Sequence, residues 1–132
     1  MLRRFRRPLL VIAAASVFAA GFASGQAAKF HFGQPKTILQ ISILKFRDGV
    51  SDAQEADILN GVKRMAGEIP GIKNVWIKAD HLDPRNFDAA FVIEFVSREA
   101  ADNYAESPIH AEWSRKLQQI REASISPQIT NP

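Results

Sequence analysis

Two side chains that can transfer protons lie close together in the stretch from Tyr104 to His110. Ser107 followed by Pro108 predicts the start of a helix, because serine caps helix N-termini and proline fits the first helical position. His110 would then lie in the first turn. The positive end of the helix dipole disfavours an imidazolium ion there, so the sequence predicts a neutral histidine that can act as a base.

Polar residues on a predicted strand could complete a site around this pair. Gln40 and Ser42 lie on one face of an apolar strand, and polar groups on such a face need partners. If that face points at the helices, a small polar cluster in an apolar cavity would suit a carbonyl or a phenol. We therefore expect catalysis, if there is any, from His110 and Tyr104, and ligand contacts from Gln40, Ser42 and Trp113. Alternatively, His110 only completes a helix-start hydrogen-bond network and Tyr104 is core.

Other chemistries are excluded or disfavoured by composition. The chain has no cysteine, which excludes disulfides, thiolate catalysis and cysteine-ligated metals. The three histidines are far apart in the sequence, and the loop around His81 is typical of a solvated segment, so we expect no metal. No glycine-rich phosphate loop, nucleophile elbow or paired-carboxylate motif is found, and no cofactor is expected.

The first 25 residues have the pattern of a signal peptide. Four arginines precede an apolar stretch, and small residues follow near Ala23. The apolar stretch is shorter than the ~20 residues that span a bilayer, so an uncleaved membrane anchor is the alternative. We expect cleavage, a periplasmic or secreted protein, a linker over residues 26–36 and a single domain over residues 37–130.

Charge argues against a nucleic-acid partner. Four of the 17 basic residues lie in residues 1–25, which have no acidic residue, so the remaining chain has 13 basic against 14 acidic residues and a net charge of −1. The basic character of the chain therefore belongs to the leader, and the domain has no basic patch for nucleic acid.

The order of predicted elements indicates an α+β fold. Strands are expected over residues 37–46, 72–79 and 87–96, with a last short strand at about 124–130 that Pro127 places at an edge or a bulge. One helix begins after Ser51, with Gln54 completing a capping box, and a helix pair begins at Ser97 and Ser107. This βαββαβ order is that of a ferredoxin-like fold with an antiparallel sheet.

The strands are apolar on both faces, whereas helices cover one face of such a sheet. An uncovered apolar face of this size does not stay in water, so the sequence predicts a two-fold dimer, sheet against sheet. Glu94 is expected to pair with Lys45 across the strands rather than to act as a general base.

Residues throughout the domain resemble the stress-responsive dimeric α/β-barrel (Dabb) family. The resemblance covers Thr37 to Thr130, and its order and spacing are more specific than any one string. Its strings are Leu44 to Gly49 before Ser51, Glu68 to Ile72, Phe91 to Phe95, Ser97 to Ala100, and Tyr104 with Ser107 to His110, which is close to the family's Y-x-x-H-P-x-H.

The resemblance implies two ferredoxin-like halves that form one barrel, with a small cavity between sheet and helices in each subunit. A plant member is a cofactor-free polyketide cyclase that uses two histidines and a tyrosine. Tyr104 matches that tyrosine and His110 matches the helix histidine. Gln40 occupies the position of the other histidine, and Ser107 replaces the first histidine of the motif. Glutamine takes up no proton at neutral pH, so the acid/base pair is incomplete.

Three functions remain open from the sequence. The first is an exported, homodimeric barrel that binds a small apolar or aromatic molecule. The second is a cofactor-independent cyclase, lyase or monooxygenase-like enzyme that uses His110 and Tyr104. The third is a structural, stress-associated oligomer, which a cavity filled by Met65, Phe91 and Trp113 would favour.

Overall fold

The computed structural model describes residues 32–83 and 86–132, of which residues 34–132 form one compact unit. Its elements follow in the order β1 (Ile38–Phe46), α2 (Asp52–Glu68), β2 (Ile72–Trp76), β3 (Ala89–Phe95), α3 (Arg98–Glu106), α4 (Pro108–Ile120), β4 (Arg121–Ile125) and β5 (Gln128–Ile129). The expected leader and most of the linker, residues 1–31, lie outside the described residues. No helix in the described part of the chain is long and apolar enough to cross a membrane.

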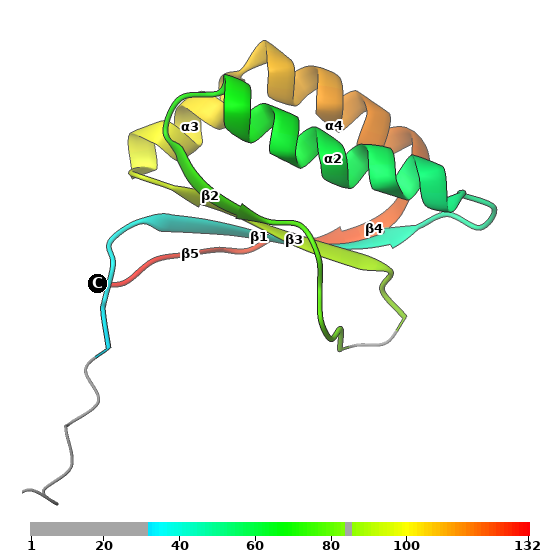
Figure 1. Ribbon diagram of the computed structural model, residues 1–132, viewed down its shortest axis with the longest axis horizontal. Helices are drawn as coiled ribbons and strands as arrows, with labels where there is room; N and C mark the ends of the chain where they lie inside the picture. Colours follow the sequence, from blue (N-terminus) through cyan, green and yellow to red (C-terminus); the bar gives the residue numbers. More distant parts are fainter. Residues whose placement is uncertain (1–31, 84–85) are drawn as a thin grey trace, which may run out of the picture. The chain divides into compact units, whose positions relative to one another are not determined.

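The strands form one antiparallel sheet in the order β2-β3-β1-β4, with β5 pairing alongside β1. The two central strands pair from Ile38 opposite Phe95 to Leu44 opposite Ala89. All three helices lie on the same side of the sheet (Figure 1). The predicted α+β, ferredoxin-like fold is thereby confirmed.

The helices begin where the sequence places their caps. The Ser51 side chain accepts from the Gln54 backbone N–H and the Gln54 side chain accepts from the Ser51 backbone, which is a complete capping box. Ser97 caps α3 through the Ala100 N–H. Ser107 ends α3 and caps α4 at the same time, with Pro108 in the first turn of α4. A single residue therefore sets the sharp turn between these two helices.

The core lies between the helices and one face of β1 and β3. On this helix-facing side Ile93 and Phe95 are fully buried, and Met65 and Val62 of α2 belong to the same buried cluster. Trp113 of α4 packs edge-on against Phe91, with ring centroids 5.7 Å apart. The alternation of buried residues along β3 matches the two-residue period expected from the sequence.

The C-terminal strand prediction was wrong in its bounds. The chain passes from α4 into β4 without a break, so that β4 begins at Arg121 rather than at about residue 124. The Arg121 N–H closes the helix on the Leu117 carbonyl, and no glycine or proline marks the change. Pro127 separates β4 from β5, as its missing N–H requires.

The second strand is also shorter than predicted, since β2 ends at Trp76 rather than at residue 79. Trp76 is the last β2 residue paired with β3, opposite Val92. Ile77 beyond it packs against the core and lines a cavity with Leu59.

The predicted Glu94–Lys45 pair is wrong. Lys45 forms an ion pair with Glu122 of β4, with the nitrogen 2.7 Å from the carboxylate oxygen. Glu94 lies opposite Leu39, not Lys45, because the register of β1 and β3 places Lys45 beyond the last paired residues. Glu94 bonds instead to Thr37 and Asn74.

The side of the sheet away from the helices is called the outer face here, and it is mainly apolar. Paired residues on neighbouring strands share a face, so both residues of every second pair lie on the outer face, and the pairs between them point into the core. Trp76, Ile125 and Ile129 on this face are 50%, 46% and 49% exposed. Its apolar members are Leu39, Ile41, Ile43, Trp76, Ala90, Val92, Ile125 and Ile129.

Two glycines of α2 provide a matched test of the helix layer. A Cβ at Gly61 would lie 2.4 Å from Cδ1 of Trp113, whereas a Cβ at Gly67 meets nothing within 4 Å. We expect Gly61→Ala to destabilise the protein by about 1–3 kcal/mol through overpacking, although alanine is the better helix former. Gly67→Ala should be neutral or stabilising by up to about 1 kcal/mol. Urea unfolding followed by tryptophan fluorescence measures both, and equal effects would contradict this packing.

Candidate functional site

The turn between α3 and α4 brings Tyr104 and His110 together. The Ser107 N–H donates to the Tyr104 carbonyl over 3.1 Å, and α4 starts at the next residue. Because the turn is so short, the two rings contact each other with centroids 4.3 Å apart and their planes inclined by 42°. The structure thus places the two predicted catalytic residues side by side.

These rings belong to an aromatic cluster that extends from the sheet to the surface. Tyr104 is buried and lies 5.0 Å from the Phe95 ring of β3. His110 is half-buried and lies 6.0 Å from the Trp113 ring, which in turn contacts Phe91. His110 is therefore the polar, partly accessible end of an otherwise apolar group of rings.

The surroundings of the two polar rings set their protonation. Burial lowers the pKa of His110, and the Ala105 carbonyl 3.3 Å from Nδ1 opposes this only in part. The imidazole is therefore neutral at neutral pH, as the sequence predicted from the helix dipole, but desolvation is the main cause here. When Nδ1 carries the proton and donates to Ala105, Nε2 is left to accept a proton. Burial raises the pKa of Tyr104 well above its ordinary value, so its hydroxyl stays a donor.

Gln40 is engaged elsewhere. Its Oε1 accepts a hydrogen bond of 2.9 Å from Gln128 Nε2, and its own Nε2 lies 3.4 Å from the Ser126 carbonyl. Arg98 of α3 donates to the other end of Gln128 over 2.6 Å. The Gln40 amide is thus tied to the C-terminal segment, at the opposite edge of β1 from β3.

The other two predicted ligand contacts lie nearer the aromatic cluster. Ser42 is buried and pairs across the sheet with Phe91, which packs against Trp113. Trp113 is buried as well, and its indole N–H donates to the Ile58 carbonyl of α2 over 2.9 Å. The structure therefore brings Tyr104, His110 and Trp113 together, with Ser42 one ring away, and leaves Gln40 outside the group.

Two cavities lined by described residues lie away from Tyr104 and His110. One, of about 300 Å³, is lined by Leu59, the segment from Ile77 to Leu82, and Asp88 to Ala90. The other is a groove of about 190 Å³ between α2 and α4, where the ring of Trp113 is flanked by Asp57, Asn60, Gly61, Arg64 and Lys116. The sequence did not predict this groove. The isolated Gly61 within an apolar-periodic helix was the one sign of a close contact there, because only glycine lets the Trp113 ring lie so near the backbone of α2.

The side chains at the centre of the layer between sheet and helices are closed to solvent. Met65, Phe91 and Trp113 are each less than 5% exposed. No group of three histidine or acidic residues that could hold a metal ion occurs among residues 32–83 and 86–132. The groups at this site that could take part in a reaction are the neutral imidazole of His110 and the protonated phenol of Tyr104, at the edge of an aromatic cluster.

The chain is similar to known proteins over nearly all of its described domain. Residues 38–127 match the model of a family described as the stress responsive A/B barrel domain (Dabb). No curated protein matches the sequence at a significant level.

Similar solved structures share the fold at low identity. A dimeric ferredoxin-like protein of unknown function from Thermobifida fusca has a TM-score of 0.63 and 20% identity, covering 79% of this chain and 99% of that one. A hydroxynitrile lyase from Passiflora edulis has a TM-score of 0.64 and 17% identity, covering 72% and 93%. SnoaB, a cofactor-independent oxygenase from Streptomyces nogalater, has a TM-score of 0.61 and 8% identity, covering 74% and 94%. At such identities these likenesses establish the fold alone.

The lowered pKa of His110 predicts a specific pH dependence of stability. Below about pH 6.5 an unfolded histidine binds a proton that the folded ring resists, so the free energy of unfolding should fall as the pH falls. Replacing the ring by an amide, His110→Gln, removes this term. Urea unfolding between about pH 8 and 5.5 should therefore show a steeper loss for the original chain than for the variant. Parallel curves would mean that His110 titrates alike in both states.

Proposed function

Since the chain belongs to the stress-responsive A/B barrel domain (Dabb) family, we propose that it acts as an exported homodimer that binds a small apolar or aromatic molecule. The ligand is held at the corner of α3 and α4, where His110 supplies the polar contact. The half-buried, neutral His110 ring beside Tyr104 is the observation that carries this proposal. An uncharged ring in an aromatic setting suits an apolar ligand with one polar group.

Neither of the two cavities described above is lined by Tyr104 or His110, so the proposed site is a corner of the surface rather than a deep pocket. Met65, Phe91 and Trp113 are buried beneath this corner. A ligand must therefore lie against the outer rings, Tyr104, His110 and Trp113, or displace one of them. If no ligand binds there, the same close packing supports the third function, a structural oligomer.

Proton-transfer catalysis is the second candidate. His110 is neutral and can take a proton at Nε2, while the Tyr104 hydroxyl remains protonated and can donate to a developing oxyanion. A lyase and a cofactor-independent oxygenase are among the solved structures with this fold. Against catalysis stands Gln40, which offers no second base and is bonded to Gln128.

The outer face supports the proposed homodimer, and the first 25 residues support the proposed export. Solved relatives are described as dimeric, and the outer face exposes large apolar side chains that a second copy would cover. The pattern of residues 1–25 supports export and a periplasmic or secreted location. N-terminal sequencing of the protein from its native cells decides the second point, since cleavage leaves a chain that begins near Gln26.

Ligand binding is tested with an apolar aromatic probe that carries one hydroxyl, 2-naphthol. We expect His110→Ala to weaken binding about tenfold or more, because a hydrogen bond in an apolar site is lost. His81→Ala serves as the matched control, since His81 is exposed and lines the other cavity. Calorimetric titration measures both. Equal affinities for the original chain and His110→Ala would place the site elsewhere, and an effect of His81→Ala alone would point to the cavity beside β2.

The dimer is tested by placing a charge on the outer face. We expect Trp76→Glu to shift the protein from dimer to monomer at micromolar concentration, because a buried, unpaired carboxylate costs several kcal/mol. Ala111→Glu adds the same charge on the exposed side of α4 and should leave the dimer intact. Sedimentation equilibrium distinguishes the states. A monomeric original chain would remove the homodimer from the proposal.

A further inference from the structure

Glu94 is a charged side chain near the end of β3, on a mainly apolar face of the sheet. It points to the outer face from β3, next to Leu39 of β1, and is 7% exposed within a single chain. Of the described residues, it is the only charged one in the buried class. A carboxylate in such a place needs partners, because an uncompensated charge costs far more to bury than an apolar group of the same size.

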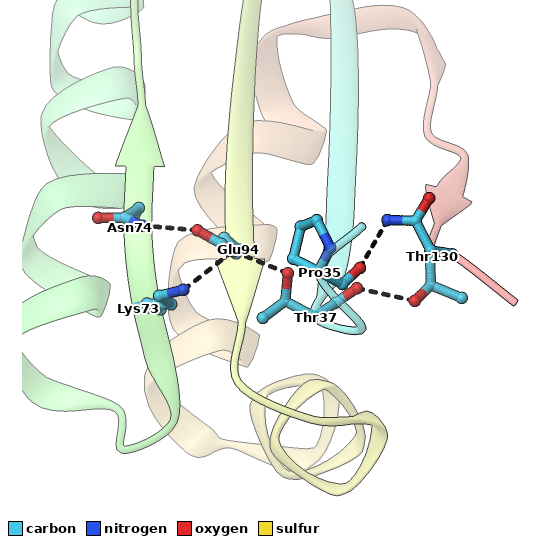
Figure 2. A network of polar contacts seen from close by, with 7 residues as sticks. Pro35, Thr37, Lys73, Asn74, Glu94 and Thr130 are labelled. Atoms are coloured by element: carbon cyan, nitrogen blue, oxygen red, sulfur yellow. Dashed lines mark hydrogen bonds and ion pairs between the residues drawn. The ribbon is translucent and has the colours of Figure 1, made fainter. Parts of the chain in front are cut away.

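Three neighbouring residues supply those partners. Thr37 Oγ1 donates to Oε1 over 2.7 Å, and Asn74 Nδ2 donates to Oε2 over 2.6 Å. The ammonium group of Lys73 lies 3.6 Å from Oε1. Figure 2 shows the carboxylate of Glu94 between β2 on one side and Thr37 on the other. The hydrogen bonds from Asn74 and Thr37 lower the pKa of Glu94 despite its burial, so it stays ionised at neutral pH.

The network continues to the C-terminal segment. Thr130 Oγ1 donates to the Thr37 carbonyl over 2.8 Å, and Asn131 Nδ2 donates to the Pro35 carbonyl over 2.6 Å. Polar contacts thus run across one end of the sheet from β2 to the residues after β5 (Figure 2). We name this strip the polar belt, and its members are Pro35, Thr37, Lys73, Asn74, Glu94, Thr130 and Asn131.

The belt restricts the orientations in which a second sheet can pack on the outer face. Apolar contact alone is non-directional, so Ile41, Ile43 and Val92 would accept a second sheet in several orientations. An orientation that laid apolar side chains over the belt would shield Glu94 and Lys73 from water without adding a partner. The cost of desolvating charged groups disfavours that orientation. An orientation that leaves the belt at the rim of the interface, or places it against polar groups, carries no such cost.

We propose that the polar belt centred on Glu94 determines the orientation in which a second copy of this chain packs on the outer face. This inference rests on the proposed homodimer, which it makes more specific. Glu94 acts here as a positioning residue, and the apolar residues beside it supply the attraction.

Distances between spin labels report the orientation directly. The chain has no cysteine, so Lys63→Cys on the exposed side of α2 gives one nitroxide per subunit. We expect one narrow distance distribution for the labelled protein. With Glu94→Leu added, a second distance should appear, and the ratio of the two orientations should fall about tenfold or more, which corresponds to ~1.4 kcal/mol.

Two further variants provide a second disruption of the belt and a matched control. Asn74→Leu removes one partner of Glu94 from an exposed position, and it should also produce the second distance even if Glu94→Leu fails to fold. Glu68→Leu removes a carboxylate from an exposed pair with Arg64 on α2 and should keep the single distance. A folded dimer in which Glu94→Leu and Asn74→Leu both keep the original distance overturns the role of the belt. Absence of any distance in the labelled original chain, with a monomer in sedimentation, overturns the homodimer itself.

Discussion

The central strands β1 and β3 are apolar on both faces, while the chain provides helices for one face only. On the helix-facing side these strands build the core, in which Ile93 and Phe95 are fully buried. On the outer face, Trp76, Ile125 and Ile129 of the flanking strands β2, β4 and β5 are about half exposed. The sheet thus stabilises the single chain through one face and exposes an apolar surface on the other.

The candidate site depends on the helix-facing side of these strands. Phe91 and Phe95 provide the floor on which Trp113 and Tyr104 lie, and the Ser107 turn places His110 over Tyr104. Desolvation by these rings, rather than a charged partner, keeps His110 neutral. Its protonation is therefore a consequence of core packing, and the site has one base and one hydroxyl donor, because Gln40 supplies no second base and is bonded to Gln128.

Polar groups interrupt the outer face at one end of the sheet. Glu94 interrupts the apolar surface, but Thr37, Asn74 and Lys73 compensate its charge within the same chain. Because Thr37 is also bonded to Thr130, the C-terminal segment and the end of β3 belong to one hydrogen-bonded network. The end of the chain therefore contributes to the shape and charge of the surface on which a partner would pack.

Local patterns in the sequence determined the fold class, the caps at Ser51, Ser97 and Ser107, and the two faces of β3, because periodicity and capping act over a few residues. They also placed Tyr104 and His110 at one helix junction. Only the tertiary structure decided that Gln40 bonds to Gln128, that Trp113 fills the core over Gly61, and that Glu94 pairs with Asn74 rather than Lys45. These contacts join residues far apart in the chain, and strand register and helix docking select them. Neither is encoded in the spacing of neighbouring residues.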